Sequence, residues 1–117
     1  MTNKGDALEM ENIMATGNAP VLEALAEINA VSLARTELDG RSLMLVRLAA
    51  LVAVDAPTSS YFLHLGPAMD VGLTAKDAED VLVAAAPIVG APRAASAAAR
   101  ISEALDVAIE IAVDESE

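Results

Sequence analysis

The chain places its one histidine and both of its aromatic side chains in one short segment, residues 56–64. His64 follows Pro57 and Ser60 at the spacing of a C-x-x-C-x-x-x-H site, but proline and serine occupy the two cysteine positions. Imidazole titrates near neutrality, so His64 is a candidate proton donor or electrophile. The alternative is a hydrogen-bonded histidine on a helix packing surface. Any chemistry in this segment must proceed without thiols.

Three further side chains are candidate substrate contacts: Arg47, Ser60 and Tyr61. Ser60 lies one helical turn before His64, where it can hydrogen-bond to the imidazole, and Tyr61 is a neighbour on the same helix. Arg47 interrupts an apolar run, and a buried guanidinium needs a carboxylate partner. We expect a structural ion pair with Asp55, and the carboxylate of a substrate is the alternative partner. No zinc-ligand cluster is present, and we expect neither a metal nor a cofactor.

Composition limits the possible classes of protein. The 117 residues carry a formal net charge of -11 and no cysteine. This length predicts a single domain, residues 1–117. The negative charge disfavours nucleic acids and anionic membrane surfaces as partners. The absence of disulfides, of a secretory signal and of an apolar run of about 20 residues predicts a cytoplasmic protein without membrane spans.

The helical spacing of apolar residues predicts the elements that position these side chains. In the N-terminal part, residues 1–37, we expect two helices, at 6–15 and 20–35, separated by turn-forming residues at 16–18. Asp39 is the candidate N-cap of the next helix, which ends near residue 55. Pro57 then opens a helix that Gly72 ends, with His64 in its middle.

In the C-terminal half, residues close together in sequence also predict where helices begin and end. Thr74 and Asp77 have the spacing of a capping box at the start of a helix, and Pro87 and Gly90 are expected to end it. Pro92 opens an alanine-rich helix that continues past Leu105. The acidic tail, residues 106–117, is expected to fray over its last residues, 114–117. Because no segment alternates apolar and polar residues with period two, the sequence predicts an all-α fold.

An ordered set of motifs resembles the carboxymuconolactone decarboxylase family. The set consists of Leu38-Asp-Gly-Arg41, Leu48-Ala-Ala-Leu-Val, His64, Gly72-Leu-Thr74, Glu79-Asp-Val-Leu82 and Ala86-Pro-Ile-Val-Gly-Ala-Pro-Arg93. The resemblance covers the family core, residues 38–105. It implies the alkylhydroperoxidase D-like fold of about six helices, assembled as a homo-trimer or homo-hexamer.

The resemblance also implies limits on activity. The peroxidase branch of the family uses two cysteines and an upstream glutamate, whose positions here hold Pro57, Ser60 and Leu45. We therefore expect no thiol peroxidase activity. One hypothesis is a cofactor-free decarboxylase-like enzyme, or a related lyase or isomerase, that acts on a small organic acid or lactone, with His64 as the catalytic residue. The other is a non-catalytic oligomer of the same fold that binds a small molecule or another protein.

Overall fold

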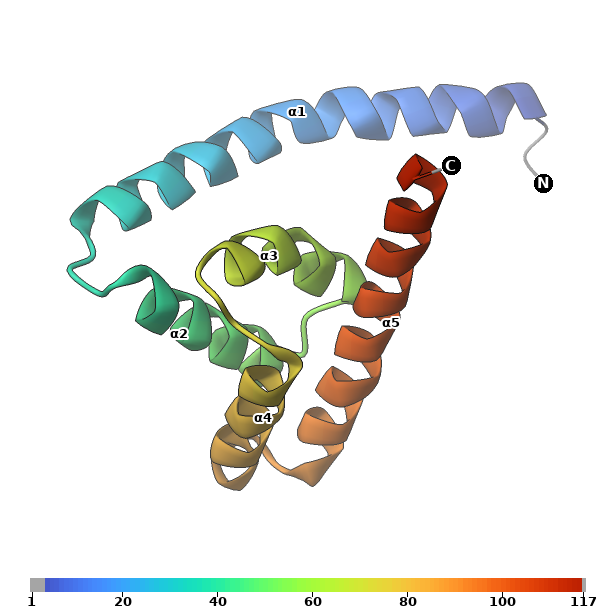
Figure 1. The fold of residues 1–117 in the computed structure, drawn as a ribbon. Helices are drawn as coiled ribbons and strands as arrows, with labels where there is room; N and C mark the ends of the chain where they lie inside the picture. The colour runs from blue at the N-terminus through green and yellow to red at the C-terminus, as the bar shows by residue number, and fades with distance from the viewer. Residues whose placement is uncertain (1–3, 117) are drawn as a thin grey trace. The chain divides into compact units, whose positions relative to one another are not determined.

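A computed structural model describes the backbone of residues 4–116 and the side chains of residues 19–116. Five helices account for most of this part of the chain, and it contains no strand (Figure 1). In chain order they are α1 (Lys4–Arg35), α2 (Gly40–Ala53), α3 (Thr58–Asp70), α4 (Ala75–Val89) and α5 (Ala91–Ser116). The prediction of an all-α fold is confirmed, with five helices instead of about six.

The chain divides into two compact units, residues 1–37 and residues 38–117. The first unit contains α1, which runs without a break where we predicted two helices separated at 16–18. That prediction was wrong because single glycine and asparagine residues cost only about 1 kcal/mol or less each in a helix rich in alanine, leucine and glutamate. Pro20 lies inside α1, so the helix passes it with one backbone hydrogen bond missing.

The second unit consists of α2, α3, α4 and α5. Helix α2 packs against the other three, and α5 likewise contacts all of its neighbours in this unit (Figure 1). Helices α3 and α4 pack on α2 and α5 but not on each other. Residues 71–74 connect α3 to α4.

Small side chains dominate the core of this unit. The buried cluster comprises Val52, Ala56, Tyr61, Ala97, Ile101 and Ala104. Three of these are alanines, which let helix backbones approach closely but bury little apolar area each. Tyr61 is the only aromatic residue in the buried cluster, at 2% exposure. The core is thus built around one ring supplied by the same segment that carries His64.

The predicted helix starts in the unit formed by residues 38–117 are confirmed. The side chain of Asp39 accepts a hydrogen bond from the Ser42 amide and caps α2. Thr74 and Asp77 form a complete capping box at the start of α4. Gly90 ends α4 with a φ of 91°, a conformation that an L-residue rarely adopts.

Two predicted ends of helices were wrong. Pro87 does not end α4, which continues to Val89. The proline withdraws one donor from the carbonyl of Val83, and this residue is 68% exposed, so water can replace the donor. Helix α5 continues to Ser116, whose hydroxyl donates to the carbonyl of Val113 and so supports the last turn. Of the tail expected to fray, Glu117 lies outside the described residues.

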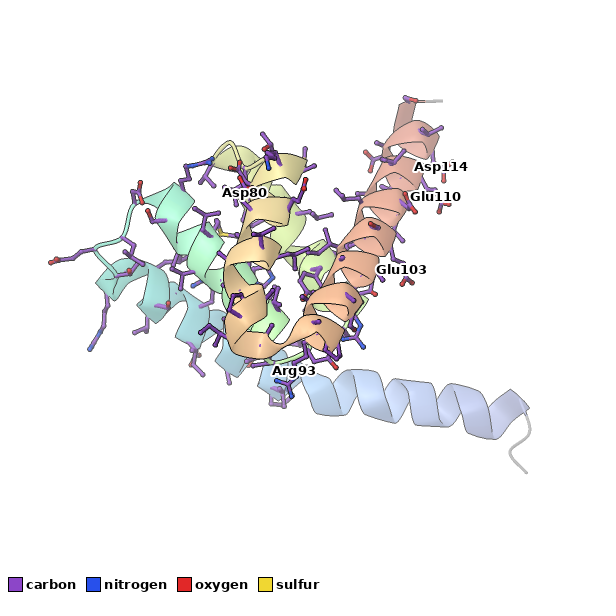
Figure 2. All side chains as sticks on the ribbon, turned by 90° about the horizontal axis from the view of Figure 1, so that it is seen from below. Asp80, Arg93, Glu103, Glu110 and Asp114 are labelled. Carbon is purple, nitrogen blue, oxygen red and sulfur yellow. The ribbon has the colours of Figure 1, made fainter. Side chains whose placement is uncertain are left out.

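Helix α5 also carries much of the negative charge. Figure 2 shows Glu103, Glu110 and Asp114 along one side of this helix, and Arg93 at its start. Over residues 4–116 no helix is both long enough and apolar enough to cross a bilayer.

Candidate functional site

A cavity of about 280 Å³ lies within the unit formed by residues 38–117. Its volume is near the lower end of the range for small-molecule sites. Helices α2, α3, α4 and α5 and the α3–α4 connection all contribute to its wall, through Met44, Leu48, Tyr61, His64, Leu65, Ala68, Met69, Leu73, Thr74, Ala75, Ala78, Ile101 and Leu105. Helices α3 and α4 do not pack on each other, and both line the cavity.

One face of α3 supplies the central part of the wall. Tyr61, His64, Leu65 and Ala68 follow the i, i+3, i+4, i+7 spacing of a single helical face. Of these, Tyr61 is buried and His64 is half-buried. The predicted helix therefore brings two of the four candidate residues, Tyr61 and His64, to the cavity.

The mouth of the cavity lies at the α3–α4 connection, because the exposed lining residues are Met69, Thr74 and Ala75. Arg41 holds this connection in place from the start of α2. Its guanidinium contacts the carboxylate of Asp77 at 2.5 Å and the carbonyl of Gly72 at 3.3 Å.

The second oxygen of Asp77 completes the network at the mouth. It accepts from the amide of Thr74 at 2.8 Å and from its hydroxyl at 3.1 Å. The hydrogen bond from Arg41, followed by the Thr74 amide, lowers the pKa of Asp77 below its ordinary value. Gly40 keeps this region compact, because a Cβ there would lie 2.9 Å from Cγ1 of Val71.

The tautomer of His64 follows from its hydrogen bond. Its Nδ1 lies 2.8 Å from the carbonyl oxygen of Ser60. A carbonyl can only accept, so Nδ1 carries the proton, and in the neutral ring Nε2 keeps its lone pair. The predicted partnership between Ser60 and His64 thus involves the backbone of Ser60, and the Ser60 side chain does not line the cavity.

Tyr61 has an unusual hydroxyl. It is buried, and among the described side chains it is the one buried polar atom without a hydrogen-bond partner. Burial raises the pKa of this hydroxyl above its ordinary value near 10, and the charge of Arg100 partly offsets the shift. The group therefore remains protonated at neutral pH and can donate a hydrogen bond. Its neighbours cover this oxygen completely, so a water or a ligand oxygen can contact it only when they shift.

Arg47 is half-buried on α2 and does not line the cavity. Its assignment as a ligand contact remains a prediction. Asp55, the carboxylate we expected it to meet, instead forms an ion pair with Arg100 at 2.7 Å. The reason is local: α2 ends at Ala53, and Asp55 has a φ of 55°, so its side chain no longer follows the helical face of Arg47.

Sequence reasoning missed Arg100, Arg41 and the role of Asp77 at the mouth. A signal for Arg100 was present, because it interrupts an apolar face of α5 between the buried residues Ala97 and Ile101. The pairing of Arg41 with Asp77 spans 36 residues and carries no local signal. Within the described part of the chain, no cluster of three histidine, cysteine, aspartate or glutamate side chains is arranged to hold a metal.

Comparison with known proteins gives one match. The model of the carboxymuconolactone decarboxylase family matches residues 19–108, which include all of α2, α3 and α4 and most of α5. No curated protein and no solved structure matches the chain.

Proposed function

Because the chain belongs to the carboxymuconolactone decarboxylase family, we propose that it is a cofactor-free enzyme that moves a proton on a small lactone or organic acid, as lyases and isomerases do. The observation that carries the proposal is the position of His64. Its ring lines a cavity of suitable size, and a backbone carbonyl fixes its Nδ1 proton. No cysteine is available, so the chemistry is not that of a thiol peroxidase.

In this proposal, Nε2 of His64 accepts a proton from the bound molecule and returns it at another atom. An imidazole can both accept and donate a proton, which suits both steps. The hydroxyl of Tyr61 donates to an oxygen of the substrate, where negative charge develops as the proton leaves. This hydroxyl has no other partner among the described residues, and the side chains that cover it must shift for the substrate to reach it. Arg47 and the Ser60 side chain would contact only a part of the substrate that extends beyond the cavity.

Replacing the imidazole tests the proposal directly. A panel of lactones and β-keto acids is scored for carbon dioxide release and for movement of a double bond. His64→Gln should lower the rate about 100-fold, the usual size of a general acid–base contribution. Leu63→Gln is the matched control, because Leu63 is the preceding residue on α3, is 73% exposed and does not line the cavity. Unchanged rates in His64→Gln would refute the mechanism.

The second candidate is a non-catalytic binding protein of the same fold. It is favoured by the lack of any charged side chain beside His64 in the cavity wall, since acid–base catalysts are commonly oriented by such a partner. Because His64 is the only histidine, the NMR signal of its ring reports binding without ambiguity. A molecule that shifts this signal but is never converted would support the binding protein over the enzyme.

We also propose that the protein assembles with itself, as a trimer or hexamer. The unit formed by residues 38–117 exposes large apolar side chains on several helices, among them Val54, Val83 and Ile88 at 72%, 68% and 87%. Such exposed groups are typical of interaction surfaces when they are contiguous. Light scattering at micromolar concentration gives the test, and a folded species of 12.0 kDa would refute assembly.

A further inference from the structure

The cavity wall carries no charge. Apart from His64, Tyr61 and Thr74, its lining side chains are aliphatic or methionine, and none of the described lysines, arginines or carboxylates lines it. Tyr61 is protonated because burial raises its pKa. A bound molecule therefore meets hydrocarbon on most sides and two or three neutral polar atoms.

The cations near the cavity already have anionic partners. Arg41 pairs with Asp77, Lys76 with Asp80 and Arg100 with Asp55. The whole chain adds a net charge of -11, which lowers the local concentration of anions. A carboxylate that entered the cavity would lose its water without gaining a counter-charge, and this is unfavourable.

We infer that the ligand of this cavity is a neutral, largely apolar molecule with one carbonyl or hydroxyl group, such as an unsubstituted lactone or cyclic ketone, and not a carboxylate. The inference rests on the proposed function, because it takes the cavity that His64 lines as the site. The single polar group would face His64 and Tyr61, and the rest of the molecule would contact the aliphatic wall.

A neutral lactone has no carboxylate to lose, so it cannot be decarboxylated. Of the proposed reactions, we therefore expect isomerisation. In a β,γ-unsaturated lactone, Nε2 of His64 takes a proton from the carbon between the carbonyl and the double bond, which leaves a dienolate and an imidazolium. The imidazolium returns the proton to the γ carbon as the dienolate collapses, and the double bond moves from the β,γ to the α,β position, in conjugation with the carbonyl. No atom is gained or lost, and no oxidant or reductant is required.

Two unreactive probes with the same carbon skeleton test the ligand class: γ-valerolactone and the hydroxy acid formed when its ring opens. Binding is read from the NMR signals of the His64 ring at pH 8.5. The lactone should bind at least about 10-fold more tightly than the hydroxy acid, because only the acid must bury a charge.

A single added charge should reverse part of this preference. Met69 lines the mouth and is 68% exposed, so Met69→Lys is compatible with folding. It should raise the affinity for the hydroxy acid about 3-fold, the effect of one partly exposed ion pair. Ser102→Lys is the matched control, because it adds the same charge at an exposed position of α5 outside the wall.

The outcomes separate the two proposals. If the hydroxy acid binds wild-type protein as tightly as the lactone, the inferred ligand class is wrong, while the cavity stands as the site. If neither probe shifts the His64 signals, the cavity is not the site, and both the inference and the proposed function fail. If Ser102→Lys raises the affinity for the acid as much as Met69→Lys, the wall does not set the preference.

Discussion

Two arginine–aspartate clusters tie the connections between helices in the second unit, and they do so in different surroundings. Arg100 reaches from α5 to the α2–α3 connection, where it contacts the Asp55 carboxylate at 2.7 Å and the carbonyls of Asp55 and Ala56 at 2.9 Å each. Arg41 reaches from α2 to the α3–α4 connection, where it contacts Asp77 and the carbonyl of Gly72. Both therefore use one guanidinium to hold a carboxylate and a turn of backbone together.

The difference lies in what each connection carries. The Arg100 cluster lies beside the core residues Ala56 and Tyr61, with Arg100 half-buried and Asp55 exposed, and it holds Asp55 in a left-handed conformation that costs energy. The Arg41 cluster is exposed to a similar extent, at 46% for Arg41 and 18% for Asp77, and it carries Thr74 at the mouth of the cavity. The comparison indicates that the first cluster stabilises the fold, whereas the second shapes access to the site.

The largest effect on stability is expected from Arg100→Met. The change removes three charge-assisted contacts, so two carbonyls lose this donor and the Asp55 carboxylate keeps only its hydrogen bond from the Ser96 hydroxyl. With allowance for the partial exposure of the pair, the free energy of unfolding should fall by about 2 kcal/mol, and Tm by about 10 °C. Thermal and urea unfolding followed by circular dichroism measure it.

Arg93→Met is the matched control for this prediction. Arg93 also donates to a carbonyl of the same region, that of Ala53 at 2.6 Å, but it is exposed and has no ion pair among the described residues. Arg93→Met should lower the free energy of unfolding by less than half as much as Arg100→Met. Equal losses in the two variants would mean that the Asp55 ion pair contributes nothing specific.

The fold was largely predictable because its start signals are local. Asp39 and Thr74 cap helices through bonds that span three residues, and Gly90 ends a helix by its own backbone conformation. The residues expected to end helices were less reliable predictors than those expected to start them. Pro20 and Pro87 each remove one hydrogen bond but lie inside helices, because the neighbouring residues favour helix and exposed carbonyls can bond to water.

The site was only partly predictable. Helical periodicity was enough to place Tyr61 and His64 on one face of α3. The pairing of Arg100 with Asp55 required knowledge that α2 ends before Asp55 and that α5 returns to this point. The uncharged character of the cavity was not visible either, because its wall is assembled from four helices that are distant in sequence.

A smaller effect, of opposite sign, is expected from Tyr61→Phe. The variant removes a buried hydroxyl that has no partner within the described structure, so stability should rise by about 1 kcal/mol at pH 7. Burial raises the pKa of this hydroxyl, so ionisation opposes folding at alkaline pH. Wild-type protein should lose stability as the pH rises above about 10, and Tyr61→Phe should lose less.

Urea unfolding between pH 7 and 11 checks both parts of this prediction. Tyr61 is the only tyrosine, so its absorbance change reports its ionisation directly. If Tyr61→Phe is less stable than wild type at pH 7, the hydroxyl has a hydrogen-bond partner, such as an ordered water. The core would then contain a third polar cluster besides those of Arg100 and Arg41. If stability rises while the rate of the enzyme falls, the hydroxyl serves the substrate and not the fold.

The smallest effect is expected from Arg41→Gln, because its ion pair with Asp77 is partly exposed and screened by water. Arg41 lowers the pKa of Asp77, so the contribution of the pair is present above the ordinary pKa of an aspartate and is lost as the pH falls through the lower, folded value. The variant should therefore reduce Tm by about 3 °C at pH 7 and by progressively less as the pH falls below the ordinary pKa of an aspartate. Lys76→Gln, which removes an exposed pair with Asp80 on α4, is the control for general charge effects.

The affinity for γ-valerolactone separates the possible outcomes. If Arg41→Gln leaves Tm nearly unchanged but alters this affinity, while Lys76→Gln changes neither quantity, the Arg41 cluster acts on the mouth of the cavity. A loss of stability equal to that of Arg100→Met would contradict the difference between the two clusters, since it would make both of them supports of the core.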